Sequence, residues 1–301
     1  MIQVIQEDSI NKVNNLFCVV IVTYNSDSRF SQNVHKLISN DNVGDIIISD
    51  NSTEKNSYVH EICKLNKVRL ISNGKNLGIG YAQNVGIDYA KTLGYKWVLT
   101  LDHDTIVKDS FIKKLHSFLI NNDCSKVAVI GTDYYDVGRK RKKFNNEAPI
   151  NVATTISSGS LINIEVYEKV GKMKAYYFID QIDNEYCYRV VKQGYEIVIL
   201  PGIGMEHKLG NIEMKKICGF EFCLYNQTPI RVYYRTRNMI IFMREYKDLK
   251  LIINNIKSLL YDLVRLFFEK NKCSKYAMFF KGLFEGLFID IKKQYCYNKV
   301  S

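Results

Sequence analysis

The sequence WVLTLDHDTIVKDSF, from Trp97 to Phe111, joins an apolar segment to a pair of acids. Its first five residues are aromatic, β-branched or aliphatic, and they predict a buried strand. Asp102 and Asp104 follow directly, with only His103 between them. Two carboxylates this close raise each other's pKa and cost stability unless a positive group lies between them. A divalent metal or a cationic part of a substrate would supply that charge.

Segments with strand and helix character alternate on both sides of this stretch. The expected strands are 17–25, 44–52, 68–74 and 96–104, and the expected helices are 33–40, 58–66, 79–94 and 110–121. Such alternation builds right-handed crossovers and a parallel sheet. The sequence therefore predicts an α/β fold with a mostly parallel central sheet flanked by helices.

Polar side chains follow each of these four strands. They are Thr23-Tyr24-Asn25, Asp50-Asn51-Ser52, the segment 73–78 and Asp102-His103-Asp104. Ligands of open α/β sheets bind outside the carboxyl ends of the strands. Because four consecutive strands deliver polar groups to one edge, we expect the binding site there.

The pattern changes after Asn121. Further strands are expected at 126–136 and 195–211, the latter ending near His207, with a strand and a short helix within 154–171. The segment 174–194 begins as extended chain and becomes a helix. From Pro229 onward the periodicity is mostly helical, so we expect a first domain at 1–228 and a helical extension at 229–301.

The charge of the chain is unevenly distributed. The formal net charge of the 301 residues is +11, and residues 231–301 hold 15 Lys and Arg against 6 Asp and Glu. Nucleic acid and an anionic membrane are the partners that such a surface suggests. The eight cysteines form no C-x-x-C pair, which favours reduced thiols in a cytosolic protein. We expect neither a signal peptide nor a membrane-spanning segment.

The common phosphate-binding motifs are absent. TYNSDSR follows the first strand, where a nicotinamide-binding domain would carry G-x-G-x-x-G, and no G-x-x-x-x-G-K-[ST] occurs. A nucleotide-dependent enzyme without them would hold phosphate through a metal. Mg²⁺ and Mn²⁺ prefer carboxylate and phosphate oxygens, and a metal bound by Asp102 and Asp104 would neutralise a departing diphosphate.

Seven motifs together resemble one family. In order they are VVIVTYN, ISDNS, NGKNLGIGYAQNVGI, LDHDT, SSGSLIN, FIDQIDNEYCYR and MEHKLGN. In this order and spacing they resemble family 2 glycosyltransferases, which have the Rossmann-like GT-A fold, over residues 17–245. DHD is similar to the D-x-D motif of that family. LDHDT, FIDQIDNE and TPIRVYYRTRN most resemble the rhamnosyltransferase branch of bacterial polysaccharide synthesis.

The resemblance implies a nucleotide-sugar site and a metal site. It implies that Asp50 accepts a hydrogen bond from the pyrimidine imide, and that Gly78 allows close approach of the backbone. The full implied donor set is Thr23, Tyr24, Asn25, Asp50, Asn51, Asn76, Gly78, Asn84, Asp102 and His103. The implied ligands of Mn²⁺ or Mg²⁺ are Asp104, Asp102 and His207.

The resemblance also implies the groups on the acceptor side. Asp183 is similar to the catalytic base of an inverting transfer, with Asp180 as the alternative. Four further residues fall on the acceptor or diphosphate side: Ser158, Gly159, Arg231 and Arg237. The implied donor is dTDP-rhamnose, with UDP-sugars as the alternative. The implied acceptor is a glycan or a lipid-linked sugar. A nucleotidyltransferase and a non-catalytic basic binding module are the alternatives from other classes.

The last two predicted helices, 249–270 and 276–293, are rich in apolar residues. We expect one apolar face on the first, formed by Ile252, Ile256, Leu259, Leu260, Leu263 and Phe267. Such a face either packs in the core or a homodimer or enters the headgroup region of a membrane. We expect a peripheral protein on the inner face of the cell membrane, with no nucleic acid as partner.

Overall fold

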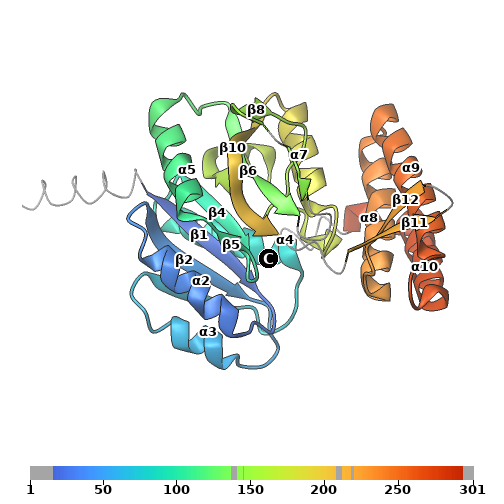
Figure 1. Cartoon of the computed structure of the whole chain (residues 1–301), viewed down its shortest axis with the longest axis horizontal. Coiled ribbons are helices and arrows are strands. Elements are labelled where there is room, and N and C mark those ends of the chain that lie inside the picture. Colours follow the sequence, from blue (N-terminus) through green and yellow to red (C-terminus); the bar gives the residue numbers. More distant parts are fainter. Residues whose placement is uncertain (1–15, 137–140, 145, 208–211, 218–219, 294–301) are drawn as a thin grey trace, which may run out of the picture.

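The structure is a computed structural model of the chain (Figure 1), and it describes residues 16–136, 141–144, 146–207, 212–217 and 220–293. For a few residues within these ranges, His207 among them, only the backbone is described. A central sheet is flanked by helices, and three long helices stand beside it (Figure 1). The predicted α/β class is therefore confirmed.

The first half of the chain alternates strands and helices as predicted. Its strands are β1 (Phe17–Thr23), β2 (Val43–Asp50), β3 (Val68–Ser72), β4 (Trp97–Asp102) and β5 (Ile106–Val107). Its helices are α2 (Ser28–Ile38), α3 (Ser57–Ile62), α4 (Ile79–Thr92) and α5 (Asp109–Asn121). β1 pairs in parallel with β2 and β4, and β2 pairs in parallel with β3. The carboxyl ends of these strands therefore lie at one edge of the sheet.

The second half extends the same sheet with strands of both directions. These strands are β6 (Val127–Asp136), β7 (Arg141–Lys142), β8 (Ile150–Asn151), β9 (Ser160–Asn163) and β10 (Glu196–His207). The sheet order is β3-β2-β1-β4-β9-β6-β10-β5, with β7 on β6 and β8 on β10. β9 runs antiparallel between β4 and β6, whereas β10 is parallel to β6. The extension carries Ser158 and the segment before α7 (Ile182–Lys192) toward the end of β4.

Both faces of the sheet are covered, which explains the continuous apolar runs of its strands. Alternate residues of β1 enter two different cores: Val19 and Ile21 pack with α2, α3 and α5, whereas Cys18 and Val20 pack toward α4 and α7. The second core also includes α6 (Ile164–Val170) and the inner side of α7 (Ile182–Lys192). A strand buried on both sides cannot slip in register without moving every side chain to the other core.

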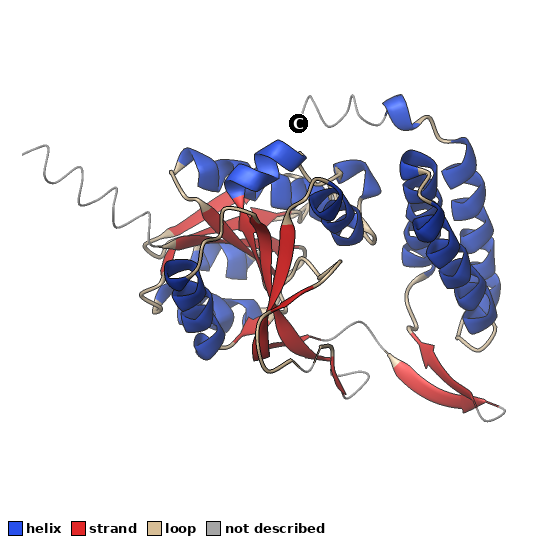
Figure 2. Ribbon diagram, turned by 90° about the horizontal axis from the view of Figure 1, so that it is seen from above, coloured by secondary structure: helices blue, strands red, loops and turns tan. Residues whose placement is uncertain are grey.

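Besides the two-residue strands β5, β7 and β8, which were not predicted, two longer segments differ from the sequence-based expectation. Residues 174–194 begin with a 3₁₀ turn, η1 (Ala175–Tyr177), rather than extended chain. Residues 213–224, for which no element was predicted, form a hairpin of β11 (Glu213–Ile217) and β12 (Phe220–Leu224). The hairpin lies apart from the main sheet, next to the C-terminal helices (Figure 2).

The C-terminal helices are α8 (Pro229–Tyr246), α9 (Leu249–Leu266) and α10 (Lys272–Phe288). α8 begins at the residue where the helical extension was expected. It is buried on two sides, because Ile241 and Phe242 enter the core beside α7 while Val232 and Met239 pack against α9 and α10. Among the described residues, no helix is both long and apolar enough to span a membrane.

Glycines allow α10 to approach α8 closely. A Cβ on Gly282 would lie 2.5 Å from the carbonyl oxygen of Tyr233, and one on Gly286 would lie 2.8 Å from that of Arg237. Real Cβ atoms do not approach backbone oxygens this closely, so a side chain at either position would force the helices apart. The two glycines, one turn apart, are therefore part of the helix interface.

We predict that Gly282→Ala destabilises the protein. In a helix without this contact, the change would stabilise by up to about 1 kcal/mol, because alanine has the higher helix propensity. A clash with a backbone oxygen reverses the sign. The measurement is the midpoint of urea unfolding, with Ser274→Ala, at an exposed position of the same helix, as control. A midpoint raised by Gly282→Ala would contradict the close packing of α8 and α10.

Candidate active site

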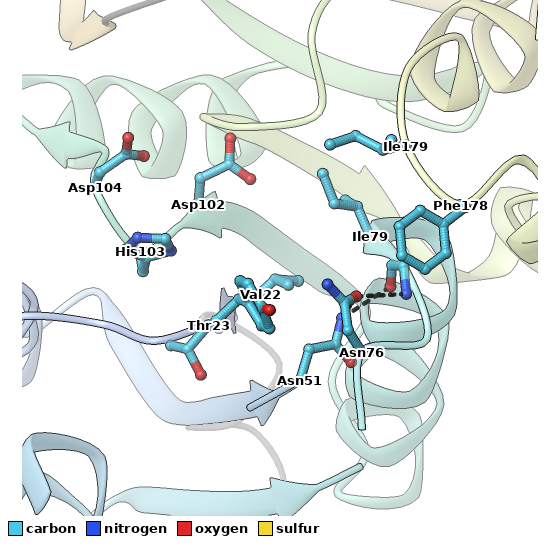
Figure 3. Close-up of a pocket in the computed structure, with 12 residues that line it drawn as sticks. Val22, Thr23, Asn51, Asn76, Ile79, Asp102, His103, Asp104, Phe178 and Ile179 are labelled. Carbon is cyan, nitrogen blue, oxygen red and sulfur yellow. Dashed lines mark hydrogen bonds between the residues drawn. The ribbon is translucent and has the colours of Figure 1, made fainter. Parts of the chain in front are cut away.

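A cavity of about 240 Å³ lies at the carboxyl ends of β1, β2 and β4. It is the place where the polar strand ends were expected to meet (Figure 3). Its walls are formed by Val22, Thr23, Tyr24, Asn51, Asn76, Gly78, Ile79, Asp102, His103, Asp104, Phe178 and Ile179. Eight of these twelve residues belong to the predicted donor and metal sets.

Asp102 and Asp104 sit on a tight turn after β4. The turn is closed by a hydrogen bond from the backbone N–H of Thr105 to the carbonyl oxygen of Asp102, at 3.1 Å. Ser158 Oγ accepts a hydrogen bond from the N–H of Asp102 at 3.0 Å and lies 2.7 Å from Thr105 Oγ1. Both carboxylates point to the same side of the turn, and His103 points to the other (Figure 3). The turn therefore presents an acid pair to the cavity.

The negative charge of this acid pair is only partly compensated by the protein. Burial raises the pKa of Asp102 to about 6 and the charge of Asp104 adds to the shift, although His103, Arg231 and the Ser158 hydroxyl act in the opposite direction. A divalent cation beside the two carboxylates would remove the cost of keeping both ionised. Oxygen donors are what Mg²⁺ and Mn²⁺ prefer, so the residues fit the predicted metal.

The described side chains contain no cluster of three or more metal-ligating residues. Strand β10 ends at His207, but the side chain of that residue lies outside the described part, so its predicted metal role stays a prediction. With two protein carboxylates, the remaining ligands would come from water and a bound diphosphate, as is usual for Mg²⁺.

Asp50 organises the end of β2. Its Oδ1 accepts hydrogen bonds from the hydroxyls of Thr23 at 2.8 Å and Ser52 at 2.7 Å, and from the Ser52 N–H at 3.2 Å. The Ser52 hydroxyl oxygen accepts in turn from the N–H of Asn25, a left-handed residue. Asp50 and Asn25 are not part of the cavity wall. They shape the strand ends that carry Thr23 and Asn51.

A chain of amides connects β2, β3 and α4. Asn51 Nδ2 donates to the carbonyl oxygen of Gly78 at 3.1 Å, and Asn73 Nδ2 donates to Asn51 Oδ1 at 3.0 Å. Asn76 Oδ1 accepts from the N–H of Gly78 at 3.0 Å (Figure 3). A Cβ on Gly78 would lie 2.5 Å from the carbonyl oxygen of Phe178. The close approach that this glycine allows is therefore to the protein's own backbone.

Phe178 and Ile179 form a wall of the cavity that the sequence did not predict. The ring of Phe178 stacks on Tyr234 of α8, with centroids 4.7 Å apart, and its carbonyl oxygen accepts from the N–H of Ile79 at 2.8 Å. Only the acids of the motif FIDQIDNE were predicted to belong to the site. Its apolar residues enclose the cavity on the side opposite β1.

The segment that follows is held by Asn238 of α8. Phe178, Asp180 and Gln181 have φ of +65°, +64° and +67°, a conformation that costs L-residues about 1–2 kcal/mol each. The buried Asn238 Nδ2 donates to the carbonyl oxygens of Tyr177, Ile179 and Asp180 at 2.8–2.9 Å. We call residues 177–181 the clamped loop. It fixes the direction in which α7 begins.

The two candidate bases differ in their partners. Asp180 forms an ion pair with Arg231, with Oδ1 2.9 Å from one guanidinium nitrogen and Oδ2 3.3 Å from Nε. Asp183 accepts a hydrogen bond from the N–H of Asn184 at 3.0 Å, and no described Lys or Arg forms an ion pair with it. Burial raises the pKa of Asp183 to about 6, and the charges of Asp180 and Asp102 contribute.

Besides Asn25 and Asp50, the predicted residues Asn84, Ser158, Gly159 and Arg237 pack against other parts of the protein and do not line the cavity. Asn84 is held by Met173 and Tyr167, since its Nδ2 donates to the carbonyl oxygen of Met173 at 2.7 Å and its Oδ1 accepts from the Tyr167 hydroxyl at 2.9 Å. Ser158 and Gly159 lie behind the acid turn; a Cβ on Gly159 would meet the sulfur of Met205. The fourth is Arg237, treated next.

Arg237 is buried and supports the clamped loop. Its guanidinium donates to the carbonyl oxygen of Tyr176 at 2.7 Å and to Asn238 Oδ1 at 2.9 Å. It also lies 4.9 Å from the ring centroid of Tyr234. The donors of Arg237 are directed at the protein, so this residue positions the clamped loop. Arg231 is the arginine that interacts with the acids of the site: it pairs with Asp180 and acts to lower the pKa of Asp102.

Comparisons with known proteins agree with this architecture. Residues 18–178 match the family model described as glycosyl transferase family 2. The chain is 31% identical to dTDP-rhamnosyl transferase RfbF of Shigella flexneri over 277 residues, which cover 86% of this chain and 91% of that protein. Its fold is similar to that of GT-A glycosyltransferases of known structure.

Two solved structures illustrate the likeness in fold. One is S. aureus TarS 1–349 in complex with UDP-GlcNAc, with a TM-score of 0.57 at 13% identity over 90% of this chain and 81% of that chain. The other is GalNAc-T7 with UDP, GalNAc and Mn²⁺, with a TM-score of 0.54 at 15% identity over 77% of this chain. The chain spans 49% of GalNAc-T7 and 44% of the longer TarS structure.

We predict that Asp183→Asn stabilises the protein at pH 8 and leaves its stability nearly unchanged at pH 4. The pKa of this carboxyl rises from 3.8 to about 6 on folding, so the free energy of unfolding falls as pH rises from about 4 to about 6, and the full cost of ionisation is present above pH 6. Asparagine avoids that cost. The measurement is the urea midpoint at the two pH values.

Asp180→Asn is the matched comparison, since it lies three residues away on the same segment. It removes the partner of Arg231, so we expect lower stability at pH 8. Equal effects of the two substitutions would show that the carboxylates do not differ as their contacts indicate.

Proposed function

The chain belongs to glycosyl transferase family 2, and on this premise we propose that it transfers rhamnose from dTDP-rhamnose, with inversion, to a glycan or lipid-linked acceptor in cell-surface polysaccharide synthesis. The observation that carries the choice of donor is the 31% identity to a dTDP-rhamnosyl transferase over 86% of the chain. Family membership also removes the nucleotidyltransferase and the non-catalytic binding module from consideration. A UDP-sugar remains the alternative donor.

The donor would occupy the cavity at the strand ends. Asp50 lies behind the cavity wall and uses Oδ1 for Thr23 and Ser52, so a thymine or uracil ring would have to reach past that wall for its imide N–H to meet Oδ2. The apolar wall of Phe178 and Ile179 would exclude water from the opposite side. A deoxysugar such as rhamnose carries a methyl group in place of a hydroxymethyl group, and an apolar wall favours it over a hexose with a free hydroxyl there.

Asp102 and Asp104 would hold Mn²⁺ or Mg²⁺. A bound divalent ion stabilises the negative charge that develops on the leaving diphosphate. Arg231 would supply a second positive charge at the same place, because it already influences Asp102 electrostatically from its position on α8. Its ion pair with Asp180 orients the guanidinium.

Asp183 would be the catalytic base. An inverting transfer is a single displacement: the acceptor oxygen bonds to the anomeric carbon as the bond to the diphosphate oxygen breaks, and the acceptor proton passes to the base. A base must be unprotonated and free to accept. The Asp183 carboxylate has no ion-pair partner among the described residues and a raised pKa, whereas Asp180 is occupied by Arg231. These contacts favour Asp183 over Asp180.

We predict that Asp183→Asn lowers kcat by about a hundredfold to ten-thousandfold, the usual contribution of a general base. In the unsubstituted protein, kcat/KM should fall about tenfold per pH unit below pH 6, because the protonated carboxyl with a pKa of about 6 cannot accept a proton. The measurement is release of dTDP from dTDP-rhamnose in the presence of acceptor.

Asp88→Asn serves as the control, since Asp88 is an exposed acid paired with Lys172 far along α4. Full turnover by Asp183→Asn at every pH would exclude Asp183 as the base. Loss of turnover in Asp180→Asn alone would transfer the role to Asp180.

We predict that dTDP-rhamnose with Mn²⁺ raises the unfolding midpoint more than any UDP-sugar does. A ligand that binds only the folded state at a hundred times its Kd stabilises by about 2.7 kcal/mol. The part of the shift that depends on Mn²⁺ should disappear in Asp104→Asn, while Asp109→Asn, an exposed acid of the next helix, should retain it. A larger shift of the unfolding midpoint with a UDP-sugar would show that this UDP-sugar, and not dTDP-rhamnose, is the donor.

A further inference from the structure

Helix α9 carries an apolar stripe that no described part of the chain covers. The stripe consists of Leu249, Ile253, Ile256, Leu260, Val264 and Phe267, whose exposed fractions are 72%, 43%, 45%, 59%, 51% and 58%. Steps of three and four residues place all six on one side of the helix. Scattered apolar residues are ordinary on a protein surface, but a continuous row marks an interaction site.

The apolar face predicted for this helix is only partly used for packing within the chain. Leu259, expected beside Leu260, is buried in the bundle with α8 and α10. Ile256, Leu260 and Phe267 point instead to solvent, together with Leu249 and Val264. The apolar surface of the helix is therefore divided: one part packs within the chain, and the adjoining part is exposed.

Helix α10 adds a second row. Phe280, Phe284, Leu287 and Phe288 are 56%, 65%, 45% and 70% exposed. Gly282 and Gly286 lie on the side of the same helix that packs on α8. The two glycines form part of the interface with α8, and Phe280, Phe284 and Phe288 lie outside it.

The charged residues of these helices differ in exposure: two of the four acids in residues 249–293 are buried, whereas most of the lysines are exposed. Asp262 and Glu269 are buried and paired internally, Asp262 with Arg235 and Arg265, and Glu269 with Arg265 and Lys275. The exposed cations of residues 249–293 are Lys250, Lys257, Lys270, Lys272, Lys281, Lys292 and Lys293. In that range, all of it described, Glu285 and Asp290 are the acids that reach the surface. The exposed apolar rows are thus bordered almost entirely by positive charge.

We propose that α9 and α10 dock on the surface of an anionic lipid bilayer. Apolar side chains in rows with lysines beside them are what an interfacial helix uses, since the side chains enter the headgroup boundary and the lysines meet lipid phosphates. A second copy of this chain would bring the same lysines face to face, which opposes a symmetric dimer on this surface. The proposal does not depend on which sugar is transferred.

The experiment is co-sedimentation of the full chain with vesicles of phosphatidylcholine alone and of phosphatidylcholine mixed with phosphatidylglycerol, at low and high salt. We expect binding to the mixed vesicles, weakened by salt. Leu260→Ser and Phe284→Ser should each lower the partition coefficient about tenfold, the usual effect of losing one large buried apolar side chain. Ile120→Ser is the matched control, because Ile120 is 61% exposed on α5, away from the proposed surface.

Charge is tested separately with Lys257→Glu, for which Lys113→Glu on α5 is the control. Lys257→Glu should weaken binding to the mixed vesicles only. The thermal shift with dTDP-rhamnose should be unchanged in all these variants, so a failure of the membrane proposal is distinguishable from a failure of the proposed donor. No binding to either vesicle would overturn the proposal. So would a dimer by sedimentation velocity that Leu260→Ser converts to a monomer, because the occupant would then be a second copy.

Discussion

The candidate site depends on one buried side chain, the amide of Asn238. Its Nδ2 donates to three carbonyl oxygens of the clamped loop, those of Tyr177, Ile179 and Asp180. Three left-handed residues in four would together cost several kcal/mol, and a loop of this kind persists only where its surroundings determine it. Asn238, on α8, holds the loop in this conformation through its hydrogen bonds, and its Oδ1 accepts a hydrogen bond from Arg237. Helix α8 therefore supports the clamped loop of the candidate site.

The clamped loop accounts for the different environments of two acids three residues apart. It turns Asp180 toward Arg231 and starts α7 so that Asp183 lines a second, small cavity together with Thr155 and Ser157, without a cation. One carboxylate is thereby kept as a fixed anion that orients a guanidinium, while the other has a pKa raised to about 6 by burial. Separation of environments is how a protein gives two identical groups different roles.

The sequence predicted the parts of the fold and site that local pattern determines. Thr23, Asn51 and Asp102 follow buried strands directly, so period, burial and strand direction were enough to bring them together. The apolar wall of Phe178 and Ile179 was missed because its position depends on left-handed backbone angles set by a helix sixty residues away. For the same reason Arg237, Asn84 and Ser158 were expected at the cavity although they support it from behind: a motif records which residues matter, but not whether they reach the ligand or hold those that do.

The excess positive charge of the chain has its structural origin in the same C-terminal helices. Residues 231–301 hold 6 acids. Two of them, Asp262 and Glu269, form ion pairs inside the bundle with Arg235, Arg265 and Lys275. A buried network of this kind is costly to desolvate, and a packed apolar core would give similar stability. The network places two acids and three cations inside the bundle, while Lys250, Lys257, Lys270, Lys272, Lys281, Lys292 and Lys293 remain exposed. The apolar residues that could have filled that interior lie instead on the solvent side of α9 and α10. The bundle thus holds a buried ion network beside its apolar core and leaves rows of leucine and phenylalanine exposed, an arrangement that is consistent with a surface that meets an apolar, anionic partner.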